Sequence, residues 1–122
     1  MRELICGGRD FRDQDALRAY LDGVLALDPD LIVIVGYDPD DPRFQGADEL
    51  AYGWAKDRGV PVMPFPAPWH RFGRSAGPRR NGRMLADGKP QRVRAFPGGD
   101  GTMNMVARAD RAGVPVEKVG WR

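Results

Sequence analysis

The stretch Leu31-Ile32-Val33-Ile34-Val35 is an uninterrupted apolar run, and four of its five residues are β-branched. A strand with one solvated face alternates apolar and polar residues, whereas a strand covered on both faces is apolar throughout. The run therefore predicts a strand buried inside a parallel sheet. Because parallel strands need crossover connections, the segments on either side are expected to contain helices.

The segments that flank this run fit such an arrangement. A short strand over 2–6 is followed by a helix that Asp13 caps and that ends near Leu27, because apolar residues recur there at helical spacing. After the run, Gly46-Ala47-Asp48 opens a second helix, and Gly59 stops it. The two helices are expected to cover the sheet.

The second half of the chain continues the alternation. Strands are predicted over 60–65, 93–96 and 114–119, and the proline inside the first of them favours a strand start or a sheet edge. One helix is expected to begin near Pro78, and another to run from about Gly101 to Ala112.

The predicted order is βαβαβαβαβ, which crossover handedness folds into one parallel sheet. The fold class is therefore α/β: a single Rossmann-like doubly wound parallel sheet of about five strands with helices on both faces. Residues 1–122 are expected to form a single domain, because a chain of this length supports one core and not two. Gly120-Trp121-Arg122 is a tail that could add to a subunit contact.

The strand over 93–96 runs into the turn Pro97-Gly98-Gly99-Asp100-Gly101-Thr102, a PGGxGT pattern. Its glycines let a ligand approach the backbone and allow positive φ where the turn needs it. The following helix points its free N–H groups and its positive dipole end at the same place, where Thr102 adds a hydroxyl. The turn predicts a phosphate site, although many turns of this kind carry glycine for shape alone.

Two other turns are expected at the same edge of the sheet. Gly7-Gly8 follows the first strand, and Gly46-Ala47-Asp48 follows the buried one. Open α/β sheets bind ligands at the carboxyl ends of their strands. The segment from Gly36 to Phe44, with three acidic residues, is predicted to be an exposed, mobile loop at this edge, either a lid or a surface insertion.

Composition excludes several classes of protein. The 122 residues are 42% hydrophobic and 30% charged, with no apolar run long enough for a membrane span and no signal peptide. The one cysteine, Cys6, cannot form an internal disulfide and is expected to be a buried small hydrophobe. One cysteine and one histidine, His70, make no metal site. We therefore expect a cytoplasmic protein with no membrane partner, no metal and no cofactor.

Basic residues crowd one region although the formal net charge is only +2. The region predicts an anionic partner, or a solvated face without a ligand. Its members are Arg71, Arg74, Arg79, Arg80, Arg83, Lys89, Arg92 and Arg94, with only Asp87 among them.

Five blocks of the chain, in order, resemble the SLOG superfamily of Rossmann-like nucleotide-binding proteins, and in particular its small YspA-like, cpYpsA-related branch of bacterial and phage proteins. The resemblance covers nearly the whole length. It implies a nucleotide or nucleotide-derived ligand held by the two glycine turns. The blocks are Cys6-Gly7-Gly8-Arg9-Asp10-Phe11, Gly46-Ala47-Asp48 with Trp54-Ala55, Pro66-Ala67-Pro68-Trp69, Ala76-Gly77-Pro78-Arg79-Arg80-Asn81 with Met84, and Phe96 to Thr102.

The superfamily also contains the LOG-type phosphoribohydrolases, from which this chain departs. Their pattern has a glutamate three residues after the threonine of the glycine turn, where this chain has Met105. A thioether accepts no proton and balances no positive charge, so LOG-type hydrolysis is in doubt. Asn81 also replaces the usual lysine, and Tyr37 to Gln45 replaces a short glycine-rich turn.

Several candidate site residues have two interpretations. Arg9 is expected to hold phosphate or ribose, or to pair with a carboxylate. Asp48 is expected to accept hydrogen bonds from ribose hydroxyls, or to cap its helix. Trp69 stacks on a base or covers the sheet edge or a dimer contact. Arg80 and Asn81 are expected at or near the exposed first turn of the helix that begins near Pro78. We favour both as ligand contacts over surface residues.

The candidate ligand-binding residues are Gly7, Gly8, Arg9, Gly46, Asp48, Trp69, Arg80, Asn81, Pro97, Gly98, Gly99, Asp100, Gly101 and Thr102. No catalytic residue is identified.

The predicted function is binding of a nucleotide or nucleotide-derived phosphate ligand, for sensing or sequestering. The alternatives are a LOG-like nucleotide N-glycosidase that uses Asp100, Asp48 or Asp10, and, ranked below, a nucleic-acid-binding module that uses residues 71–94. A homodimer or higher homo-oligomer is also expected, because small domains often cover apolar helix faces by self-association.

Overall fold

The computed structural model describes residues 1–121. Its strands are β1 (Arg2–Cys6), β2 (Ile32–Val35), β3 (Val62–Pro64), β4 (Arg92–Ala95) and β5 (Val116–Lys118). Its helices are α1 (Gln14–Leu27), α2 (Ala47–Arg58), α3 (Trp69–Phe72), α4 (Ala76–Gly88) and α5 (Asp100–Arg111), with a 3-10 turn, η1 (Gly73–Ser75), between α3 and α4.

The five strands form one sheet in the order β3-β2-β1-β4-β5, and every neighbouring pair is parallel. The central strand β1 pairs on both sides, with Leu4 beside Ile34 and Val93. The chain winds outward from β1 to β3 and then crosses to β4 on the other side. This confirms the predicted Rossmann-like α/β fold and puts its topological switch point between β1 and β4.

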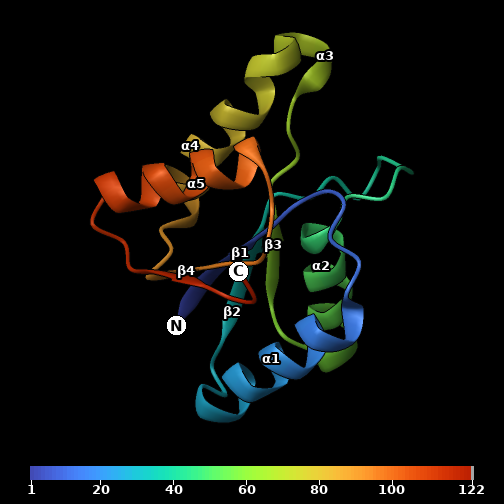
Figure 1. The fold of residues 1–122 in the computed structure, drawn as a ribbon, viewed down its shortest axis with the longest axis vertical. Coiled ribbons are helices and arrows are strands. Elements are labelled where there is room, and N and C mark those ends of the chain that lie inside the picture. Colours follow the sequence, from blue (N-terminus) through green and yellow to red (C-terminus); the bar gives the residue numbers. More distant parts are fainter. Residues whose placement is uncertain (122) are drawn as a thin grey trace.

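Helices cover both faces of the sheet (Figure 1). Alternate residues of β1 belong to two separate apolar clusters: Ile5 packs with α1 and α2, whereas Leu4 packs with α4 and α5. The buried run of β2 divides in the same way, with Val33 on the first face and Ile34 on the second. The predicted two-sided burial of this run is confirmed.

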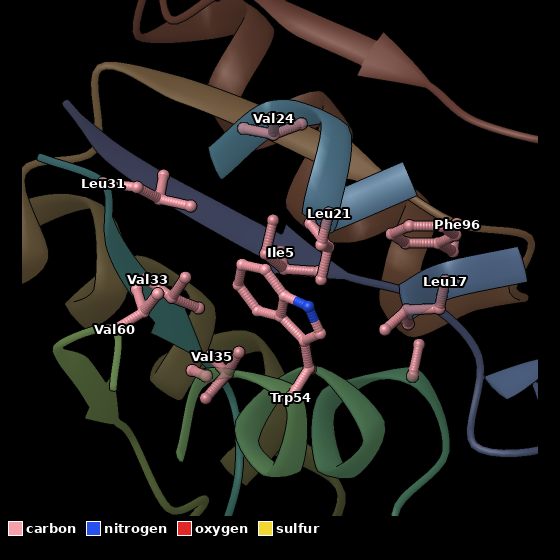
Figure 2. Close-up of a cluster of buried hydrophobic side chains, with 13 residues drawn as sticks. Ile5, Leu17, Leu21, Val24, Leu31, Val33, Val35, Trp54, Val60 and Phe96 are labelled. Carbon is pink, nitrogen blue, oxygen red and sulfur yellow. The ribbon is translucent and has the colours of Figure 1, made fainter. Parts of the chain in front are cut away.

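Trp54 of α2 lies at the centre of the first cluster, among side chains of β1, β2 and α1 (Figure 2). Its side chain is fully buried. The indole Nε1 donates to Asp22 Oδ1 at 2.9 Å, and Arg58 pairs with the same carboxylate. The hydrogen bond satisfies the one polar atom that Trp54 brings into the core.

A buried ion network joins β1, β4 and β5 on the same face. Arg94 Nε lies 2.5 Å from Glu3 Oε2, its Nη1 lies 2.7 Å from Glu117 Oε2, and it also contacts the hydroxyl of Tyr20. Arg92 reaches Glu3 at 3.7 Å. Carboxylates of the protein therefore neutralise Arg94, which does not belong to an exposed basic region, whereas the side chain of Arg92 stays 38% exposed.

The helical segment before β4 differs most from expectation. The helix predicted to begin near Pro78 is confirmed as α4, which begins at Ala76. The short helix α3 and the bend at Gly73, with φ of 54°, that leads through η1 into α4 were not predicted. Pro78 is the third residue of α4, where its missing N–H still costs no hydrogen bond. Arg80 and Asn81 consequently lie in the second turn rather than in an exposed first turn.

The acidic segment after β2 is held together by hydrogen bonds among its own residues. The side chain of Gln45 is buried, accepts from Asp38 N at 2.9 Å and donates to the carbonyls of Asp38 and Asp41. Asp41 forms a two-point ion pair with Arg43. These contacts order the loop internally, and its role as a lid or a surface insertion stays a prediction.

The ends of the sheet match the sequence in outline. The strand β3 is an edge strand, as its proline indicated, and both β3 and β5 are shorter than predicted. Trp121 donates from Nε1 to Ala95 O at 2.7 Å and so packs on its own chain. Arg122, the last residue of the predicted contact tail, lies outside the described residues.

Within residues 1–121, no helix combines the length and hydropathy of a membrane span.

We predict that Trp54→Ala lowers the free energy of unfolding by about 3–5 kcal/mol, because it empties a buried site and leaves the Asp22–Arg58 pair without its indole donor. Urea unfolding followed by circular dichroism measures the change. As the control, Leu27→Ala is expected to change stability by less than about 0.5 kcal/mol, since Leu27 is 91% exposed. Equal losses in the two variants would contradict this account of the core.

Candidate functional site

A cavity of about 180 Å³ lies at the carboxyl ends of β1, β2 and β4, at the switch point of the sheet. Nine predicted site residues line it: Gly7, Gly8, Arg9, Asp48, Arg80, Asn81, Gly99, Gly101 and Thr102. The cavity wall does not include five others: Gly46, Trp69, Pro97, Gly98 and Asp100.

The two glycine turns touch each other through their backbones. Gly8 N donates to Pro97 O at 2.9 Å, and a Cβ on Gly98 would stand 2.6 Å from Gly8 N and 2.1 Å from Thr102 Oγ1. Gly98 is therefore needed for the packing of the turns against each other. The expectation of positive φ in the PGGxGT turn is wrong, because the positive-φ glycines lie at other positions.

The start of α2 joins the same contact. Ala47 N donates to Gly8 O at 3.1 Å, and Gly46 adopts a φ of 69°. A Cβ on Gly46 would stand 2.0 Å from Gly8 O, so no other residue fits there without moving the turn. Gly46 thus shapes the site from behind the cavity wall instead of facing a ligand.

The N-terminus of α5 opens toward the cavity. Its cap residue is Gly99, which has no side chain to bond the first-turn N–H groups. A Cβ on Gly99 or Gly101 would meet none of the described residues within 4 Å. Donors and the positive end of the helix dipole therefore face open space, which suits an anion.

Arg80 reaches the cavity across the end of β2. Its guanidinium packs on Gly36, where a Cβ would stand 2.5 Å from Nη1, and Nη1 lies 3.4 Å from Phe65 O. Burial lowers the pKa of Arg80, against the opposing effect of Asp48. Gly36 was not predicted as a site residue, and its role is to leave room for this arginine.

Asn81 is buried and bonded within the protein. Its Nδ2 lies 3.3 Å from Gly101 O and 3.2 Å from Asn104 Oδ1, and its Oδ1 accepts from Arg80 Nε at 3.1 Å. It therefore holds Arg80 and the first turn of α5 in place, and few of its hydrogen-bonding positions remain for a ligand.

Asp48 brings an unpartnered acceptor to the cavity. Gly46 occupies the cap position of α2, so the alternative that Asp48 caps the helix is wrong. Its Oδ1 is shielded from solvent and has no hydrogen-bond partner within residues 1–121. Burial raises the pKa of Asp48 to about 7, although Arg80 and Arg9 act in the opposite direction.

Arg9 stands exposed beside the cavity, next to Trp69. Its guanidinium lies 5.4 Å from the centre of the indole ring, a cation–π contact. Neither Arg9 nor Arg80 forms an ion pair with a carboxylate in the described part of the chain, which removes the salt-bridge alternative for Arg9. Two cations therefore share one cavity with a single acid.

The remaining acids considered for catalysis lie elsewhere. Asp100 is exposed at the first position of α5, and Asp10 lines a shallow neighbouring groove. Met105 lines the cavity and is 1% exposed, so a thioether fills the place where LOG enzymes have glutamate. Asp48 is the one acid of the three that lines the cavity.

Sequence reasoning missed five lining residues: Cys6, Gly36, Gln45, Met84 and Met105. Burial raises the pKa of the Cys6 thiol, helped by Asp48, so it lines the cavity in its neutral form. Cys6 and Gly36 directly end or follow strands at the carboxyl edge, a positional signal that could have identified them. Gln45 sits in a loop whose path the sequence does not define.

We predict that Asp48 makes stability fall as pH rises. Its pKa in the folded protein lies above the ordinary value of 3.8, so folding favours the protonated acid, and this contribution is lost between about pH 4 and pH 7. Asp48→Asn removes the titration. The free energy of unfolding of the variant is expected to rise relative to that of wild type from pH 5 to about pH 7, by at most about 1.4 kcal/mol per pH unit, and the difference is expected to level off above pH 7.

Urea unfolding at pH 5, 6, 7 and 8 measures this difference. Asp10→Asn, an exposed acid at the same edge of the sheet, serves as the control and should follow the wild-type pH dependence. Parallel curves for wild type and Asp48→Asn would contradict a raised pKa of Asp48 in the folded protein.

Comparison with known proteins finds a protein family that the amino-terminal part of the chain matches. The model of the YspA, cpYpsA-related SLOG family matches residues 1–72, more than half of the chain. The match includes the turns after β1 and β2, whereas α4 and the PGGxGT turn lie beyond it. No curated protein matches the sequence.

Proposed function

The chain belongs to the YspA, cpYpsA-related SLOG family, and on that basis we propose that its cavity binds a nucleotide or nucleotide-derived phosphate ligand. The observation that carries the proposal is the charge in the cavity. Among the described residues Arg9 and Arg80 form no ion pair with a carboxylate, and the open N-terminus of α5 faces the same space.

The phosphate is assigned to the first turn of α5. Backbone N–H groups from Gly99 to Thr102 supply donors without side chains in the way. Arg80, held by Asn81 and Gly36, adds a guanidinium that has little freedom left to lose on binding. Family membership alone is consistent with nucleotide-related binding. The N–H groups of the first turn of α5 and the guanidinium of Arg80 support, in addition, a phosphate group on that ligand.

The sugar is assigned to Asp48. Its unpartnered Oδ1 would accept a hydrogen bond from a hydroxyl group, which removes the cost of leaving that atom unsatisfied. The cavity of about 180 Å³ is smaller than the roughly 300–1,000 Å³ of pockets that enclose a drug-sized ligand. It therefore takes the phosphate and sugar, and the base lies outside, where Arg9 and Trp69 stack.

One observation favours the alternative of a nucleotide N-glycosidase. An acid with a pKa of about 7 inside a cavity is suited to exchange a proton at neutral pH. The hydrolase would use Asp48 and would release free base and ribose phosphate from a nucleoside monophosphate. Met105, in the place of the glutamate, argues for binding without turnover.

We predict that Gly99→Asp weakens binding of a nucleoside monophosphate at least tenfold, because it adds a carboxylate beside the phosphate. The matched control is Gly99→Ala. A Cβ at this position meets none of the described residues within 4 Å, and φ is −102°, so both variants should fold and the alanine variant should bind nearly as wild type.

Isothermal titration calorimetry with a panel of mononucleotides, dinucleotides and cyclic nucleotides measures the affinities, and chromatography of each mixture detects free base. Intact ligand in every mixture supports a binding protein. Free base that disappears with Asp48→Asn supports the hydrolase. Equal affinities for Gly99→Asp and Gly99→Ala would contradict a phosphate at the turn.

The homodimer or higher homo-oligomer stays a prediction. Light scattering at micromolar concentration tests it, and a monomer would count against it.

A further inference from the structure

The segment of α3 and α4 is rich in positive charge, and Arg80 is the one basic residue of this segment that lines the cavity. Between Trp69 and Lys89 the chain has six basic residues and one acidic residue, a formal charge of +5 in a protein of +2. The basic residues are Arg71, Arg74, Arg79, Arg80, Arg83 and Lys89, and the acid is Asp87. The helix α3 and the beginning of α4 project at the end of the molecule opposite α1 (Figure 1).

The two sides of α4 face different surroundings. Arg80 and Met84, four residues apart, line the cavity, whereas Arg79 and Arg83 line a separate groove of about 600 Å³. None of the residues that line the groove also lines the cavity. A ligand of one would therefore leave the other accessible.

The lining of the groove combines apolar and basic side chains. Pro68, Phe72 and Ala86 contribute apolar surface, and Arg71 and Arg83 lie at the same groove. In the described part of the chain, the one ion pair there joins Arg83 to Asp87 at 4.0 Å, and both side chains are more than half exposed. Such a pair offsets little of the charge.

The arginines of the groove are held in position by an aromatic ring. The guanidinium carbon of Arg79 lies 4.2 Å, and that of Arg71 5.0 Å, from the centre of Phe72. Arg79 Nε also donates to Ser75 Oγ at 3.2 Å. Because the stacking orders both guanidiniums before any ligand arrives, less entropy is lost when they bind.

We propose that this groove binds a single-stranded nucleic acid. Such strands need cations for their phosphates together with apolar or aromatic surface for their bases, and the groove offers both. Planar guanidiniums match phosphate in two-point hydrogen bonds, and the groove cations are all arginine. An acidic peptide would pair with the arginines, but it has no flat bases to cover the apolar residues that line the groove.

The experiment measures fluorescence anisotropy of a labelled 20-nucleotide single strand, as DNA and as RNA, at several salt concentrations. With three arginines in the groove, the slope of log affinity against log salt is expected near −2. Replacing Arg79 and Arg83 by glutamine should reduce its magnitude by about 1.4 and the affinity at least tenfold.

The matched control replaces Arg111 and Lys56 by glutamine, which removes the same charge from exposed positions outside the groove. It should change affinity less than threefold, and Gly99→Asp should bind the strand as wild type does. Equal losses in the two double variants, displacement by poly-glutamate as effective as by unlabelled strand, or no binding at 50 mM salt would each overturn the proposal.

Discussion

The candidate site depends on the backbone of Gly8, which contacts both the PGGxGT turn and the start of α2. Gly8 N bonds to Pro97 O, and Gly8 O accepts from Ala47 N. Through these two hydrogen bonds the ends of β1 and β4 and the start of α2 are fixed relative to one another. The contact requires that Gly98 and Gly46 have no Cβ, so glycine is used here for packing as well as for access.

The electrostatics of the cavity follow from this arrangement. The start of α2 brings Asp48 beside Arg80, and the turn after β1 brings Arg9. Burial then acts on each group in the direction that disfavours charge: it raises the pKa of Asp48 and lowers that of Arg80. An anionic ligand with a hydroxyl group would pair its negative charge with Arg80 and donate a hydrogen bond from the hydroxyl to Asp48. A phosphate next to a sugar has both groups and therefore suits the site.

Sequence reasoning succeeded where a pattern has one physical solution. The apolar run before Gly36 required a two-sided parallel strand, and glycines after strands marked the sheet edge where the cavity lies. It failed for features decided by tertiary contacts. The burial of Arg94 depends on carboxylates from β1 and β5, far away in sequence, and charge alone grouped it with the exposed arginines. Asn81 was correctly placed near the site, but its partners on α5 could not be known from composition.

Binding of phosphate at the N-terminus of α5 can be followed by NMR, in a titration of the ¹⁵N-labelled protein with a nucleoside monophosphate. We expect the amide signals of Gly99, Gly101 and Thr102 and the side-chain Nε signal of Arg80 to shift together with one dissociation constant. Shifts confined to other parts of the protein, with these signals unchanged at saturation, would contradict it.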